Sequence, residues 1–251
     1  MYLMDNIWLA SCKKHRVSRG HNETRLSLRG IQVGCVLTLV EESWKAVNIH
    51  DLAQTEAQVS AKVLANGQWL ENCLALVLNG LDPGKAAARP IMESFWQTMV
   101  LEQPIIIGDA ALDLAEFMNL LQFLDRAASP QSSFIQERTA LYIKPRSLPK
   151  FPPRVVRFIE ILDTKIKNKV FFMAAGSGFS SGLTFGLAHE GVRPDDTICV
   201  FEGAKVPHLL RQQDLRCWTF VNEVYVYDIM HGEAEASIDD RRVESETFVL
   251  V

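Results

Sequence analysis

Residues 170–227 read VFFMAAGSGFSSGLTFGLAHEGVRPDDTICVFEGAKVPHLLRQQDLRCWTFVNEVYVY, and this stretch decides the fold. It contains short runs rich in β-branched and aromatic residues, which Gly, Pro and Asp separate from one another. Several such runs at close spacing predict the strands of a small antiparallel barrel or meander. The predicted strands are Val170–Ala174, Leu183–Ala188, Thr197–Phe201, His208–Arg211 and Cys217–Tyr227.

A second β-rich stretch lies near the beginning of the sequence. Arg25–Val40 reads RLSLRGIQVGCVLTLV and largely alternates apolar and polar residues, with Gly30 as a predicted turn or bulge and Gly34 as a second irregularity. Asn6–Ser11 is a further predicted strand. We therefore expect an N-terminal β-hairpin in this region.

Between these two stretches the apolar residues fall three and four positions apart, which predicts amphipathic helices. The first helical stretch has Asn66-Gly67 as its predicted break, and Trp69, Phe95 and Trp96 are predicted core residues. The Pro-rich segment Lys144–Pro153 is the predicted connection to the last helix. The helical stretches are 50–78, 90–101, 109–126 and 153–167.

The predicted fold class is therefore α+β. Residues 1–150 form a mainly helical region with an N-terminal β-hairpin, and residues 151–251 form a helix plus a small C-terminal antiparallel β-barrel-like unit. The charged stretch Asp239–Glu246 is expected at the surface, and the apolar end Phe248–Val251 either docks back onto the fold or frays.

The composition is that of an ordinary globular protein. Of 251 residues, 48% are hydrophobic and 22% are charged, with a formal net charge of -4. These values exclude a disordered, collagenous or disulfide-scaffold protein, and the lack of a basic excess argues against nucleic acid as the main partner. We see no signal peptide, membrane span or lipidation signal, so we expect a cytoplasmic location and no membrane partner.

One motif resembles that of a serine hydrolase. Gly178–Gly182 matches G-x-S-x-G, in which a sharp turn presents a serine hydroxyl to a histidine. Ser180 with His231, and with Asp196 or Asp228 as the acid, would have the required chain order. The sequence upstream is mainly helical, where a hydrolase needs several parallel strands, so a Gly/Ser hairpin loop is the favoured interpretation and hydrolysis stays an alternative.

Other chemistry-bearing patterns are weak. Cys12, His15 and His21 lack the four tightly spaced ligands of a structural zinc site, and the glycine-rich stretch at 176–182 lacks the lysine of a phosphate-binding loop. The five cysteines include no CxxC pair, and Cys35, Cys73 and Cys199 lie in apolar runs. We expect no cofactor, no metal and no disulfide.

The most distinctive stretch runs from Asp195 to Glu233. It resembles the C-terminal region of fungal heterokaryon incompatibility (HET) proteins, which reads P-G-D-x-I-C-V-L-x-G-x-x-V-P-x-x-L-R and then x-G-E-x-Y-V-x-G-I-M-x-G-E. An aromatic pair at 171–172 and the run Glu93–Met99 fit upstream elements of the family. The HET domain itself, which is similar to TIR folds and triggers cell death, is not part of this pattern. The motif residues are Phe172, Asp196, Gly203, Pro207, Arg211, Glu223, Tyr225, Met230, Gly232 and Glu233.

The resemblance implies an accessory module of non-self recognition without catalysis. Its partner would be a protein, such as one that contains a HET domain. We interpret most motif residues as structural, with Gly203 in a turn and with Arg211 and Glu223 forming a charge-assisted bond between adjacent strands. Two alternatives stay open: a hydrolase that uses Ser180 and His231, and a β-barrel that binds a small ligand in its mouth.

Overall fold

The computed structural model describes residues 18–19, 25–46, 56–79, 88–102, 106–107, 110–111, 160–176, 182–214, 217–234, 236 and 244–251. The chain divides into two compact units. The sheet unit comprises Met1–Leu39 and Val170–Val251, and the helical unit comprises Val40–Lys169. Residues far apart in the sequence therefore build the sheet unit together.

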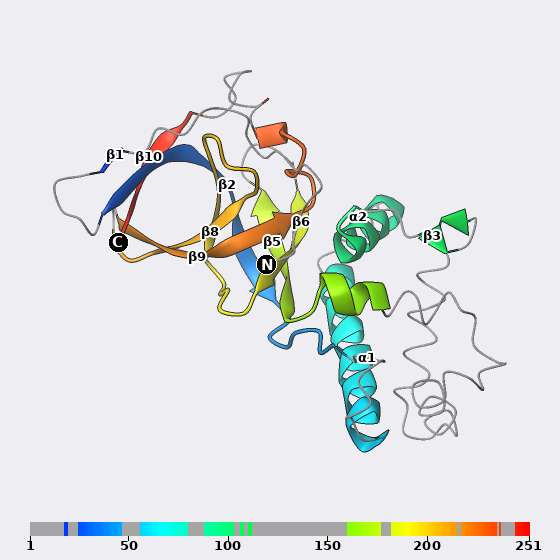
Figure 1. Ribbon diagram of the computed structural model, residues 1–251. Helices are drawn as coiled ribbons and strands as arrows, with labels where there is room; N and C mark the ends of the chain where they lie inside the picture. Colours follow the sequence, from blue (N-terminus) through cyan, green and yellow to red (C-terminus); the bar gives the residue numbers. More distant parts are fainter. Residues whose placement is uncertain are drawn as a thin grey trace. The chain divides into compact units, whose positions relative to one another are not determined.

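The sheet unit contains one eight-stranded sheet with the strand order β1-β2-β5-β6-β9-β8-β7, and β10 lies off this path (Figure 1). Nearly all neighbouring strands are antiparallel, but β10 runs parallel to β9 through Val249 and Leu250. The sheet is therefore mixed. Its strands are β1 (Ser18–Arg19), β2 (Leu26–Leu39), β5 (Lys169–Gly176), β6 (Leu183–His189), β7 (Thr197–Phe201), β8 (His208–Gln212), β9 (Cys217–Val226) and β10 (Glu246–Leu250).

The sheet closes on itself through β2, the long arc in Figure 1. Residues 34–39 of β2 pair with β5, and residues 30–35 pair with β7 at the other end of the strand order. Residues 26–30 of β2 pair with β10, which reaches β9. Register shifts next to Gly34 and between Val36 and Thr38 interrupt both ladders, as bulges that bend a strand do.

The predicted fold class is wrong. The N-terminal part is not mainly helical with a hairpin of its own, because β2 is a single 14-residue strand at the centre of the sheet. The sheet is likewise not confined to the C-terminal part, nor is it wholly antiparallel. The error has a physical reason. Strand pairing between residues so far apart depends on tertiary packing, and local sequence patterns do not specify it.

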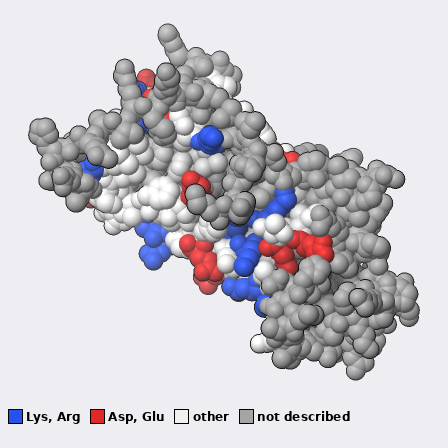
Figure 2. All heavy atoms as spheres, viewed as in Figure 1, with Lys and Arg blue, Asp and Glu red and all other residues white. Residues whose placement is uncertain are grey.

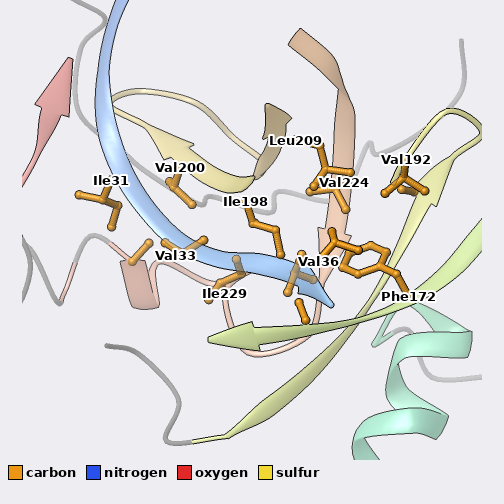
Figure 3. Close-up of a cluster of buried hydrophobic side chains, with 14 of the residues drawn as sticks. Ile31, Val33, Val36, Phe172, Val192, Ile198, Val200, Leu209, Val224 and Ile229 are labelled. Atoms are coloured by element: carbon orange, nitrogen blue, oxygen red, sulfur yellow. The ribbon is translucent and has the colours of Figure 1, made fainter. Parts of the chain in front are cut away.

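Strand β7 separates two apolar clusters, because successive side chains of a strand point to opposite faces. Ile198 and Val200 belong to a large cluster, in which side chains from β2, β7, β8 and β9 turn toward one another (Figure 3). Cys199 and Phe201 belong to a second cluster, which Phe248 and Leu250 of β10 complete. The uninterrupted apolar sequence TICVF of β7 follows from burial on both faces.

Two glycines of β2 permit close approach of neighbouring strands. A Cβ atom at Gly30 would lie 2.5 Å from the carbonyl oxygen of Val200, and one at Gly34 would lie 2.6 Å from that of Ala175. Gly30 is therefore a contact position within a continuous strand. The predicted turn at Gly30 is absent from this described strand.

The helical unit contains α1 (Glu56–Asn79), α2 (Ala88–Val100), helical residues at 160–165 and a two-residue pairing of β3 (Ile106–Ile107) with β4 (Ala110–Ala111). Trp69, Phe95 and Trp96 are buried, as predicted. The predicted break at Asn66-Gly67 is wrong, because α1 continues through it. No helix among the described residues is long and apolar enough to cross a membrane.

Some predictions fall on other residues. The strand at Asn6–Ser11 and the division at residue 150 lie outside the described residues. Of the helix predicted at 109–126, only 110–111 are described, and they form β4. The apolar end of the chain docks back as part of β10, with Phe248 fully buried.

Candidate functional site

The motif residues bring one buried ion pair together. Asp196 at the start of β7 accepts hydrogen bonds from Nε and Nη2 of Arg211 on β8, both at 2.8 Å. The Asp196 side chain is 2% exposed and that of Arg211 is 27% exposed. The same Asp196 carboxylate accepts a hydrogen bond from the backbone N–H of Arg193, at 2.7 Å. Two parallel bonds of this kind fix orientation as well as distance.

Arg211 also connects β8 to the loop that precedes β7. Its Nη2 donates to the carbonyl oxygen of Gly191 at 2.7 Å. The hydrogen bonds that Arg211 donates to the Asp196 carboxylate raise the pKa of the guanidinium, so Arg211 stays charged. The pair therefore fastens β7, β8 and the loop at 191–195 to one another. The backbone of Asp195 and Asp196 continues this connection by pairing with Val36 of β2.

The predicted bond between Arg211 and Glu223 is wrong. Arg211 lies opposite Thr219 in the register of β8 and β9, whereas Glu223 lies opposite His208. Because of the register shift between Leu209 and Leu210, the residue opposite Glu223 is three positions from Arg211, which places the two side chains on opposite faces of the pair. Arg211 instead donates to Asp196, which lies next to β7 on the other side of β8.

The other motif residues hold the backbone or fill the core. Gly203 and Gly232 have φ angles of 80° and 93°, which favour glycine. Glu233 accepts a hydrogen bond from the backbone N–H of His231, and the carbonyl oxygen of Pro207 accepts one from Val224. The side chains of Phe172, Tyr225 and Met230 are buried.

One small cavity lies in the described part of the sheet interior. A cavity of about 10 Å³ lies beside Thr184, Val226 and Asp228, which is room for about one water molecule. The hydroxyl of Thr184 donates to the carbonyl oxygen of Tyr227 at this place. Packed apolar side chains occupy the described interior around it, which argues against a metabolite site there.

The two candidate acids of the hydrolase alternative, Asp196 and Asp228, give it no support. Ser180 lies outside the described residues, so its position relative to His231 is not described. Asp196 is committed to Arg211. The backbone N–H of His231 donates to Glu233, and Asp228 has a left-handed backbone with a φ of 77°.

The helical unit holds a serine–lysine contact that the sequence analysis did not single out. Nζ of Lys45 donates to Oγ of Ser43 at 2.9 Å. Ser43 is 4% exposed, so a substrate has no access to its hydroxyl. Ser43 and Lys45 lie two positions apart in an irregular segment, and this spacing gives no sequence signal for such a contact.

Three of the described cysteines are poor nucleophiles. Burial raises the pKa of Cys73 and Cys199, and to a smaller degree that of Cys35, which keeps these thiols protonated. Among the described residues, no group of three or more His, Cys, Asp and Glu side chains is arranged to hold a metal ion.

Comparison of the chain with protein-family models, with curated proteins and with solved structures finds no match. The functional argument therefore rests on the residues themselves.

Proposed function

We propose that this chain is a non-catalytic protein-interaction module of the kind that accompanies HET domains. The observation that carries the proposal is the use of the motif residues. Asp196 and Arg211 fasten strands, Gly203 and Gly232 allow left-handed turns, and the aromatic members fill the core. A binding scaffold needs residues that stabilise its sheet, because its function then lies in the residues of its surface.

The charge distribution favours a protein partner over nucleic acid. On the face in Figure 2, Lys and Arg side chains of the described residues are interspersed with Asp and Glu side chains. Together with the net charge of -4, this argues against the extended basic surface that phosphate binding needs.

The test is direct binding to a HET-domain protein encoded in the same genome. Isothermal titration calorimetry with the purified full chain should give a saturable 1:1 complex with a Kd below about 10 µM. A TIR-domain protein without a HET domain serves as the control and should give no heat of binding. Absence of binding to every HET-domain protein of that genome at 100 µM would overturn the proposal.

A further inference from the structure

Glu223 is the motif residue to which the structure gives no structural task. It is exposed on β9, and no ion pair or hydrogen bond joins its carboxylate to the part of the chain that the structure describes. Two other carboxylates of the sheet unit are engaged: Asp196 with Arg211, and Glu202 with Arg29 at 3.6 Å. An exposed carboxylate that has no partner among the described residues is available to a cation from another molecule.

Phe220, on the same strand, presents an aromatic ring to solvent. Its side chain is 45% exposed, although it lies in the middle of β9. Phe220 lies opposite Leu210, and Glu223 lies opposite His208 two residues earlier on β8. Since directly opposed residues of an antiparallel pair share a face, Phe220 and Glu223 lie with His208 on the face of the β8–β9 pair that carries Leu210.

A row of aromatic rings in mutual contact holds Phe220 in place. Its ring centroid lies 5.6 Å from that of His208, which lies 5.1 Å from that of Phe201, and both contacts are tilted. Phe201 packs edge-on against the buried Phe248 at 5.7 Å. Phe201 and Phe248 belong to the second apolar cluster, so His208 connects Phe220 to the core and the exposed part of its ring is pre-organised.

An exposed aromatic ring on the same strand face as a carboxylate that has no partner among the described residues fits one side chain best, namely arginine. A guanidinium can stack on the ring while its N–H groups donate two parallel hydrogen bonds to the carboxylate. We propose that Phe220 and Glu223 bind an arginine side chain of the protein partner. This inference rests on the proposed function, because it places the protein partner against this face of β8 and β9.

The first test uses the ¹⁵N-labelled full chain and the peptide acetyl-Gly-Arg-Gly-Arg-Gly-amide, titrated by NMR. We expect millimolar binding with shift changes confined to β8 and residues 218–224 of β9. The citrulline peptide, which keeps the shape without the charge, should bind at least tenfold more weakly, and the lysine peptide at least fivefold more weakly. Equal shifts with the citrulline or lysine peptide, or shifts elsewhere on the chain, would contradict arginine recognition.

The second test uses variants that leave the core intact. Glu223→Gln and Phe220→Ala should each weaken binding of the arginine peptide at least fivefold. Glu244→Gln and Leu183→Ala are matched controls, since both residues are exposed in the sheet unit, and they should bind as the parent does. Unchanged binding by the Glu223 and Phe220 variants would refute the inference.

The two proposals fail in different ways. If a HET-domain protein binds the parent and the Glu223→Lys variant equally, the docking surface is wrong while the interaction module stands. If the arginine peptide binds as expected but every HET-domain protein fails to bind, the surface stands and the partner class is wrong.

Discussion

Removal of Arg211 should destabilise the sheet unit more than removal of its partner. In Arg211→Met, the Asp196 carboxylate stays buried with its 2% exposed side chain and keeps one backbone donor, the N–H of Arg193. A buried charge that loses its partner costs about 3–5 kcal/mol. For a chain of this size, about 4 kcal/mol lowers Tm by about 8–16 °C.

The converse variant, which removes the carboxylate of Asp196 and leaves Arg211, should destabilise the sheet unit less. In Asp196→Asn, the 27% exposed guanidinium of Arg211 keeps its bond to Gly191 and can turn toward water, so we expect a loss of about 1–3 kcal/mol. The double variant should cost less than the sum of the two single variants by at least about 1.5 kcal/mol, since neither charge is then left alone.

Urea denaturation followed by circular dichroism measures these free energies of unfolding, and hydrogen exchange in β7 and β8 localises them to the sheet unit. Arg193→Met is the control, because Arg193 contributes its backbone N–H to Asp196, and it should change stability by less than about 0.5 kcal/mol. If Arg211→Met costs less than about 1 kcal/mol, or if the two losses are additive, the pair does not fasten the strands.

Three further predictions concern packing and protonation. Phe248→Ala should cost about 3–5 kcal/mol in urea denaturation, because it removes a buried ring between Phe201 and Trp218, and a loss below 1 kcal/mol would mean that β10 is not part of the core. Gly186→Ala should lower the free energy of unfolding by at least about 1–3 kcal/mol, because its Cβ would lie 2.6 Å from the carbonyl oxygen of Tyr225. In Gly182→Ala the added Cβ meets no atom within 4 Å, so the same assay should find this variant nearly neutral. Above about pH 9 the unfolded chain releases the thiol protons of Cys73 and Cys199, whereas their raised pKa values keep them protonated in the folded state, so stability should fall as pH rises through that value. The urea midpoint should fall less between pH 8 and pH 10 in Cys199→Ala than in the parent, and an equal fall would contradict the burial of that thiol.

Local patterns located the strands of the second half of the chain well. Each predicted strand between 170 and 227 corresponds to an observed strand within a few residues, because alternation and turn residues are local signals. The pairing of β2 with β5, β7 and β10 was beyond such reasoning. Its partners lie more than a hundred residues away in sequence, and nothing in Arg25–Val40 specifies them.

The two wrong interpretations of glycine have different causes. Gly30 and Gly67 were predicted as turn or break positions, yet both lie in continuous elements. At Gly30 the missing side chain admits the backbone of Phe201. In α1, Asn66 next to Gly67 donates to and accepts from the backbone of Lys45 at 2.7 and 2.8 Å, which stabilises the helix where its propensity is poor.

The error over Arg211 bears on how the motif should be interpreted. Two charged motif residues on adjacent strands suggested an ion pair, but a one-residue register shift in β8–β9 places Glu223 beside His208 and leaves Arg211 to Asp196. Charge complementarity in a sequence therefore names possible partners without choosing among them, since a single bulge changes which residues share a face. The same shift sets Glu223 on the same strand face as the exposed ring of Phe220, so the residue that the sequence assigned to the scaffold becomes the one available to a partner.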